Sequence, residues 1–80
     1  MRIKQVTPKD NYYLLIQSEN CKQGKFDVKP YLKSEAFADL HSQSEFQKVK
    51  NGKYFIEWDC GADLSADTIE AKWKLMPPLE

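Results

Sequence analysis

The amino-acid sequence predicts an α+β fold with a mainly antiparallel sheet: a three-stranded meander, short helices, then a hairpin and a C-terminal helix. Stretches with the period-two alternation of strands fill the first 28 residues and recur after residue 52. Between them the apolar spacing changes to that of helices. With 80 residues the chain has room for one domain, whose core must be small.

Three consecutive strands are expected at the start of the chain. Residues 2–7 include strand-forming side chains, and the turn residues 8–11 follow, among them a proline that cannot continue a ladder. Residues 12–18 are the most apolar stretch of the first half and predict the central strand. A reversal at 20–21, with 23–24 as the competing turn position, would lead into the third strand.

The form of that turn decides which face of the central strand is buried. A two-residue turn would set Leu15 opposite Phe26 and direct Tyr13 and Leu15 toward the core. A bulge would direct Leu14 and Ile16 there instead. The competing turn position differs from the two-residue turn by an even shift, so it would bury the same face.

The middle of the chain predicts two short helical pieces rather than one long helix. Ser34 can cap the first piece, in which Phe37 and Leu40 lie three residues apart. Residues 42–45 have the serine-to-glutamate spacing of a capping box. The apolar residues expected to meet in the core are Phe26, Val28, Phe37, Leu40, Phe46, Val49, Ile56 and Ile69, with Trp73 as a further candidate.

A hairpin is expected in the last third of the chain. Alternating residues over 53–58 predict a core strand that places Tyr54, Ile56 and Trp58 on one face. Gly61 can adopt the positive φ that a tight reversal needs. The chain should therefore turn back as a short antiparallel strand.

A capped helix is expected to follow the hairpin. The Ser65 side chain can accept a hydrogen bond from the first helical turn, and Asp67 suits the positive end of the helix dipole. After Trp73 a pair of prolines forbids further helix. We therefore expect a single α+β domain over residues 1–74 and a loosely ordered C-terminal tail over residues 75–80.

Charge and composition weigh against several classes of protein. Twelve basic and twelve acidic side chains cancel, so no global field draws the chain to nucleic acid or to an anionic membrane. No apolar run approaches the roughly 20 residues that cross a bilayer, and the N-terminus lacks a signal-peptide core. Cys21 and Cys60 are too few for a disulfide framework and are expected to be reduced thiols at separate turns. These features predict a soluble, cytoplasmic protein with no membrane partner.

The sequence has no residue pattern that predicts catalysis. His41, the only histidine, lies at a predicted helix end, where its side chain can bond terminal carbonyls. No local signature joins it to Cys60 as a base to a nucleophile. We expect that the protein is not an enzyme and has no catalytic residues and no cofactor.

Four acidic residues around the second hairpin are expected to serve as caps and solvated groups rather than as a metal site. With a two-residue turn, Glu57 and Asp63 would point to opposite faces of the hairpin. The loop also lacks the alternating oxygen ligands of a calcium loop. The four residues are Glu57, Asp59, Asp63 and Asp67.

The aromatic content points to contact with another chain, because a domain this small cannot hide so many rings and aromatic residues are favoured at interface hot spots. We therefore expect a non-catalytic interaction module that binds another protein or self-associates. The alternative is a nucleic-acid or small-ligand binding domain. The interaction candidates are Tyr12, Tyr31, Trp58 and Trp73. The basic candidates for nucleic acid are Lys48, Lys50 and Lys53, and a second group of Lys22 and Lys25.

The order and spacing of several motifs resemble one known family. The motifs are Ile-Glu-Trp at 56–58, Gly-Ala-Asp-Leu-Ser at 61–65 and Asp-Thr at 67–68, with upstream matches between residues 26 and 49. Over Ile3 to Thr68 they resemble the small bacterial proteins catalogued as domain of unknown function 2442. The C-terminal motif includes Gly61, Asp63, Leu64, Ser65 and Asp67.

The resemblance implies an antitoxin-like or regulatory accessory role, because similar proteins often stand beside toxin-like proteins. Some are joined to a helix-turn-helix domain, which this sequence lacks, so the resemblance does not extend to direct DNA binding. Family members typically have Asn-Gly at both hairpin turns, where this chain has Asn20-Cys21 and Cys60-Gly61.

Overall fold

The computed structural model describes residues 1–76 and confirms the predicted α+β class with two antiparallel sheets. The large sheet has the order β1-β2-β3-β7, with β1 Ile3–Lys9, β2 Tyr13–Ser18, β3 Gln23–Asp27 and β7 Lys74–Met76. The small sheet has the order β4-β5-β6, with β4 Lys50–Asn51, β5 Phe55–Glu57 and β6 Asp63–Ser65. The α-helices are α1 Gln43–Phe46 and α2 Ala66–Lys72, and the 3-10 segments are η1 Asp10–Tyr12, η2 Lys29–Lys33 and η3 Glu35–His41.

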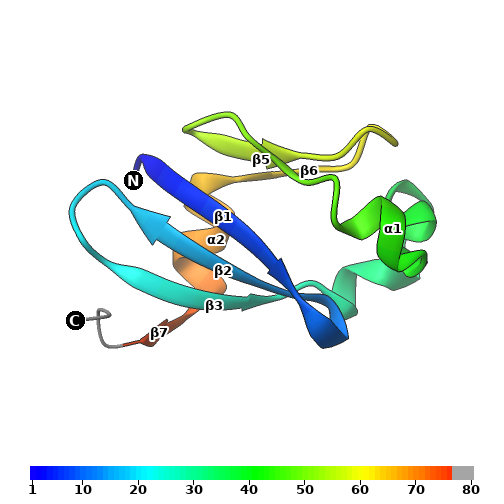
Figure 1. Cartoon of the computed structure of the whole chain (residues 1–80), viewed down its shortest axis with the longest axis horizontal. Coiled ribbons are helices and arrows are strands. Elements are labelled where there is room, and N and C mark those ends of the chain that lie inside the picture. Colours follow the sequence, from blue (N-terminus) through cyan, green and yellow to red (C-terminus); the bar gives the residue numbers. More distant parts are fainter. Residues whose placement is uncertain (77–80) are drawn as a thin grey trace.

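The large sheet, helix α2 and the small sheet surround the core. Figure 1 shows α2 behind the large sheet, the small sheet along one side, and α1 at one end of the molecule. The face of the large sheet that is turned away from α2 carries no helix in the described part of the chain. The core is made by Ile3, Leu14, Ile16, Phe26, Val28, Leu32, Phe37, Leu40, Phe46, Ile56, Trp58, Ala62, Leu64, Ala66 and Ile69, with Val49 and Trp73 packed against it.

Strand β1 continues past the point where the sequence predicted a turn. Pro8 lies within β1 and pairs with Leu14 of β2. Strand β1 is an edge strand of the large sheet, so the missing N–H of Pro8 can face away from the ladder. The chain then reverses through η1, where Asn11 and Tyr12 both adopt a φ of 62°.

The reversal between β2 and β3 has three residues, so the expected two-residue turn is wrong. Ser18 N donates to Lys22 O over 2.8 Å, and Cys21 between them adopts a φ of 69°. The competing turn at residues 23–24 is also wrong, because both residues lie in β3. The odd register sets Leu14 opposite Phe26. The buried face of β2 is therefore that of Leu14 and Ile16, which was expected only if the turn contained a bulge. Tyr13 and Leu15 lie on the opposite face.

The two predicted helical pieces are present as η3 and α1, but their side-chain caps do not form. Neither Ser34 nor Ser42 caps its helix with its side chain, and Ser42 Oγ instead lies 3.0 Å from Ser44 Oγ. The three-residue spacing of Phe37 and Leu40 matches the period of a 3-10 helix, and both are buried in η3. The preceding segment η2 was not predicted.

The small sheet begins three residues earlier than expected, with a strand β4 that was not predicted. Strand β4 pairs with β5, and Lys53 at the turn between them adopts a φ of 73°. This turn moves Tyr54 off the buried face, where it was predicted, to a position that is 61% exposed. Two hydrogen bonds to Ile3 of β1 then join the two sheets. Asn51 Nδ2 donates to Ile3 O over 2.9 Å, and Ile3 N donates to Lys53 O over 2.7 Å.

The second hairpin also has a three-residue turn. Trp58 N donates to Ala62 O over 2.9 Å, and Gly61 has a φ of +95°, which confirms the positive φ predicted for it. The register sets Glu57 directly opposite Asp63, so both point to the same face. The expectation that they point to opposite faces is wrong, because it assumed a two-residue turn.

We predict that Gly61→Val lowers the free energy of unfolding by about 1 to 2 kcal/mol, because a β-branched residue is strained at positive φ. Nothing lies within 4 Å of the position where a Cβ would be, so the cost comes from the backbone alone. Gly61→Asn is the control, since asparagine tolerates this conformation better. The measurement is thermal unfolding, and equal melting temperatures for the valine variant and the wild type would contradict the turn assignment.

Helix α2 has the predicted cap, and the chain continues as a strand beyond it. Ser65 Oγ accepts from Thr68 N over 3.1 Å, and Asp67 lies in the first turn. Strand β7 then pairs with β3, with Met76 opposite Gln23. Leu75 and Met76, which were predicted to belong to a loosely ordered tail, thus lie in a strand. Residues 77–80 of the predicted tail lie outside the described residues.

Candidate functional site

Six aromatic rings form one continuous chain through the core, and three of the predicted interaction residues belong to it. The order is Tyr12, Phe46, Trp58, Phe37, Tyr31 and Phe26, with successive ring centroids 5.4, 6.1, 6.1, 5.5 and 5.7 Å apart. Trp58 lies in the middle, is 3% exposed, and donates from Nε1 to Phe46 O over 2.8 Å. Trp58 therefore does not lie at the surface, as an interaction residue would.

Tyr12, the first ring of this chain, and Tyr31, the fifth, lie close to the surface. Both are half-buried, and the Tyr12 hydroxyl donates to the backbone carbonyl of His41. Trp73, the fourth candidate, is half-buried elsewhere, with its ring against the Cα of Gly24. The structure thus leaves Tyr12, Tyr31 and Trp73 partly accessible, and within residues 1–76 no ring-to-ring contact joins Trp73 to the other two.

An open cleft lies beside Tyr31. It has a volume of about 410 Å³ and is lined by Phe26, Asp27, Pro30, Tyr31 and Lys72. The pairing of β7 with β3 stops at Lys74 opposite Lys25, so the last two residues of β3 have no neighbouring strand on this side in the described part of the chain. The cleft thus combines apolar rings, one cationic and one anionic side chain, and a strand edge without a neighbouring strand.

The cleft itself was not predicted from the sequence. Only Tyr31 was singled out there, because aromatic residues stand out by type. Lys72 reaches the cleft from the end of α2, far along the chain from Pro30, and no local pattern in the sequence records that proximity.

The histidine and the two thiols occupy separate parts of the fold. His41 ends η3, and its Nε2 lies 3.0 Å from Leu32 O. Cys21 and Cys60 are unbonded thiols at the two hairpin turns, and only Cys21 is fully exposed. Among residues 1–76, no group of three or more histidine, cysteine, aspartate or glutamate side chains is placed to hold a metal ion.

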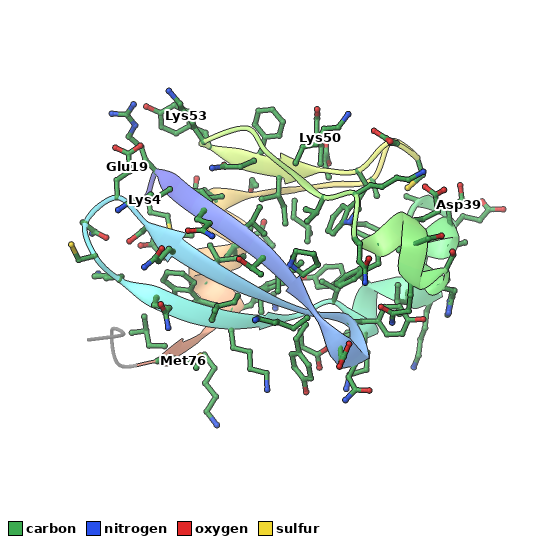
Figure 2. The ribbon with its side chains drawn as sticks, viewed as in Figure 1. Lys4, Glu19, Asp39, Lys50, Lys53 and Met76 are labelled. Carbon is green, nitrogen blue, oxygen red and sulfur yellow. The ribbon has the colours of Figure 1, made fainter. Side chains whose placement is uncertain are left out.

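The lysines that the sequence indicated as a basic strip are partly neutralised. Lys50 Nζ lies 2.7 Å from Asp59 Oδ1, and Lys48 Nζ lies 3.1 Å from Glu45 Oε1. The hydrogen bond and the opposite charge raise the pKa of Lys50 and lower the pKa of Asp59. Figure 2 shows Lys50 and Lys53 on the side of the small sheet, away from Met76.

The residues of the C-terminal motif have structural positions. Gly61 makes the turn, Leu64 is buried, and Ser65 caps α2. Asp63 and Asp67 are exposed. This motif builds the hairpin and the start of the helix, and it lines neither the cleft nor the hollow described next.

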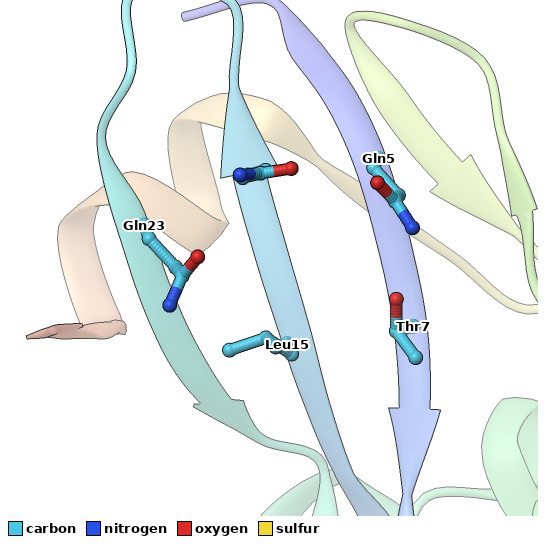
Figure 3. Close-up of a pocket in the computed structure, with 5 residues that line it drawn as sticks. Gln5, Thr7, Leu15 and Gln23 are labelled. Atoms are coloured by element: carbon cyan, nitrogen blue, oxygen red, sulfur yellow. The ribbon is translucent and has the colours of Figure 1, made fainter. Parts of the chain in front are cut away.

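A second hollow lies on the outer face of the large sheet. It has a volume of about 100 Å³ and is lined by Gln5, Thr7, Leu15, Gln17 and Gln23. Figure 3 shows these side chains rising from three neighbouring strands. The alternation of β2 indicated an outer face, but the identity of the face depended on a turn whose length the sequence did not determine.

A family model described as "Protein of unknown function (DUF2442)" matches residues 3–74. The chain belongs to this family. The DUF2442 match runs from the first residue of β1 to the first residue of β7, so both sheets and α2 lie within it almost completely. We found no match among curated proteins and none among solved structures. Over residues 1–76, none of the helices is both long and apolar enough to cross a bilayer.

Proposed function

We propose that this DUF2442 chain is a non-catalytic interaction module that binds an extended segment of another protein in the cleft beside Tyr31. The observation that carries the proposal is the incomplete pairing of β3, which leaves a strand edge at a cleft lined by three apolar and two charged side chains. An extended peptide can add to such an edge through main-chain hydrogen bonds, while neighbouring pockets select its side chains.

The side chains of the cleft suit this mode of binding. Phe26 and Tyr31 stack with centroids 5.7 Å apart, and Pro30 adds a third apolar surface. Aromatic residues with a few charges at the rim are typical of interface cores. Lys72 would favour a partner segment with a carboxylate at the matching position.

The biological setting of the proposal comes from the family resemblance. We propose an antitoxin-like or regulatory accessory role, with a toxin-like protein as the partner and with the cytoplasm as the compartment. Two free thiols suit a reducing compartment.

The test compares capture of one partner by the tagged chain and by two variants. Tyr31→Leu removes the ring but keeps apolar volume in the core, and Lys72→Glu reverses the rim charge. Each is expected to weaken binding by about 1 to 3 kcal/mol. Lys33→Glu, an exposed charge reversal outside the cleft, is the control and should bind as the wild type does.

Thermal melts must show that the variants remain folded, because Tyr31 also packs against Phe37 at 5.5 Å. The partner is first identified by pull-down from the native host and then titrated in purified form. Equal affinity of the wild type, Tyr31→Leu and Lys72→Glu for that partner would rule out the cleft as the binding site. Capture of a second copy of the chain would show self-association instead.

A further inference from the structure

Charge is distributed unevenly along this neutral chain. Residues 1–34 contain seven basic and three acidic side chains, whereas residues 35–70 contain three basic and eight acidic ones. The first segment forms β1, β2 and β3, and the second forms the small sheet and most of α2. The large sheet together with its turns and η2 is therefore the basic part of the molecule, although the composition as a whole suggested no field.

Hydrogen-bonding side chains cross the outer face of the large sheet in a row. Gln5 of β1 pairs with Gln17 of β2, and Gln17 pairs with Gln23 of β3. Thr7 lies beside them, opposite Leu15. None of the four polar side chains makes a hydrogen bond to another described residue, and all four face the hollow seen in Figure 3. The amides of Gln5 and Gln17, each able to donate and to accept, are thus open to a ligand, whereas Gln23 lines the hollow but is only 3% exposed.

Unpaired cations gather around the aromatic ring at the end of this face. Lys25 Nζ and Lys29 Nζ lie 4.0 and 4.6 Å from the ring centroid of Tyr13. Lys74 of β7 lies directly opposite Lys25, an arrangement of like charges that is unfavourable in a sheet. Asp27 lies opposite Tyr13 on the same face, and its Oδ1 accepts from the backbone N of Lys29 over 2.9 Å. Within residues 1–76 the three lysines nevertheless form no ion pair, so an anion bound here would relieve their repulsion.

We propose that the outer face of the large sheet binds single-stranded nucleic acid. The lysines would contact the phosphates, Tyr13 and Leu15 would contact the faces of the bases, and the glutamine amides would reach the base edges. Aromatic residues next to a basic groove are the common means of binding single strands, and the amide groups match the donors and acceptors of unpaired bases. An acidic protein segment could satisfy the lysines and, through its backbone, the amides, but its acidic side chains offer no flat face to stack on the Tyr13 ring, as an unpaired base does.

This surface adjoins the cleft beside Tyr31 at Asp27, which lies opposite Tyr13 and also lines the cleft, but the lysines, Tyr13 and the glutamines of the outer face do not line the cleft. In β3, Phe26 points into the core and helps to line the cleft, whereas Lys25 and Gln23 belong to the outer face. Loss of one binding activity therefore does not imply loss of the other.

The test is a fluorescence anisotropy titration of the full chain with labelled single strands of about 12 nucleotides, oligo-dT and oligo-U. Three phosphate contacts would give a log-log salt slope of about −2. Affinity is then expected to fall roughly 20-fold between about 50 and 200 mM salt. Absence of binding at the lower salt with micromolar protein would overturn the proposal.

Three variants locate the site. Lys25→Glu is expected to weaken binding about tenfold and to reduce the salt slope by about 0.7. Tyr13→Leu keeps an apolar side chain but removes the stacking ring, with an expected loss of roughly five- to hundredfold. Lys53→Glu makes the same change in net charge on the side of the small sheet and is expected to bind within about twofold of the wild type.

Two further outcomes would overturn the proposal. Equal weakening by Lys53→Glu and Lys25→Glu would show only non-specific attraction to net charge. Poly-glutamate that competes as well as the oligonucleotide, together with an unchanged affinity of Tyr13→Leu, would identify an acidic polypeptide as the ligand of this face. Melting curves establish that each variant is folded, and all three substituted side chains lie outside the buried core.

Discussion

Replacing Trp58 by alanine is expected to lower the free energy of unfolding by about 3 to 5 kcal/mol, the usual cost of removing a large buried aromatic side chain. A domain of this size is expected to have a total stability of about 4 to 12 kcal/mol, so the loss removes a large share of it and the variant should unfold at a markedly lower denaturant concentration. The ring packs between Phe37 and Phe46, both at centroid distances of 6.1 Å. No other ring in the chain of aromatics joins these two halves.

A second substitution keeps the test informative if the alanine variant does not fold. Trp58→Phe retains an aromatic ring but loses the hydrogen bond from Nε1 to Phe46 O. It should cost about 1 to 3 kcal/mol, because the buried carbonyl is left without a partner. Urea unfolding followed by circular dichroism measures both variants.

Trp73→Ala is the matched control, because Trp73 is half-buried and lies outside the chain of rings. Its loss should cost clearly less than that of Trp58. An equal or larger effect of Trp73→Ala would contradict the central position that the structure gives to Trp58.

The residue types and their spacing were enough to predict most of the fold. Period-two alternation identified β2 and β5, and the Ser65 cap and Gly61 turn were predicted from local chemistry that the structure reproduces. Such features depend on a few neighbouring residues, and this is why they can be read without the rest of the chain.

Two of the errors come from turns in which a residue other than glycine adopts positive φ. Cys21 at 69° and Lys53 at 73° take positions that asparagine or glycine would normally fill. Neither cysteine nor lysine predicts a positive φ. The length of the β2–β3 turn and the exposure of Tyr54 were therefore mispredicted. A change of one residue in the first turn exchanges the two faces of β2, which moved Tyr13 and Leu15 from the expected core to the outer surface.

The candidate binding surfaces were predictable only in part, for the same reason. Aromatic residues could be named as interaction candidates, but burial depends on contacts between distant segments, as for Trp58 with Phe46. The row of glutamines can be recognised only when the register of three strands is known. The unpaired lysines can be recognised only when it is known which other lysines form ion pairs. Neither can be obtained from composition, in which the charges cancel.

Gly24→Ala is expected to lower the free energy of unfolding by about 1 to 3 kcal/mol, although the residue lies within a strand and has no positive φ. A Cβ at this position would lie 2.4 Å from Cδ2 and Cε3 of Trp73. The ring must therefore move, and with it the start of β7, whose Leu75 pairs with Gly24. Alanine should otherwise favour a strand over glycine, so a loss of stability would come from the ring.

A double-mutant cycle isolates this contact. In a Trp73→Ala background the ring is gone, so Gly24→Ala should cost little or become slightly stabilising. Gly52→Ala is the control for the clash itself, because its Cβ would lie 2.4 Å from Cζ of Phe55. Phe55 is 38% exposed and its ring can move toward solvent, so that variant should lose less than about 1 kcal/mol. If Gly24→Ala costs the same with and without the Trp73 ring, the ring does not hold β7 against β3, because the cost then arises from the backbone of β3 alone.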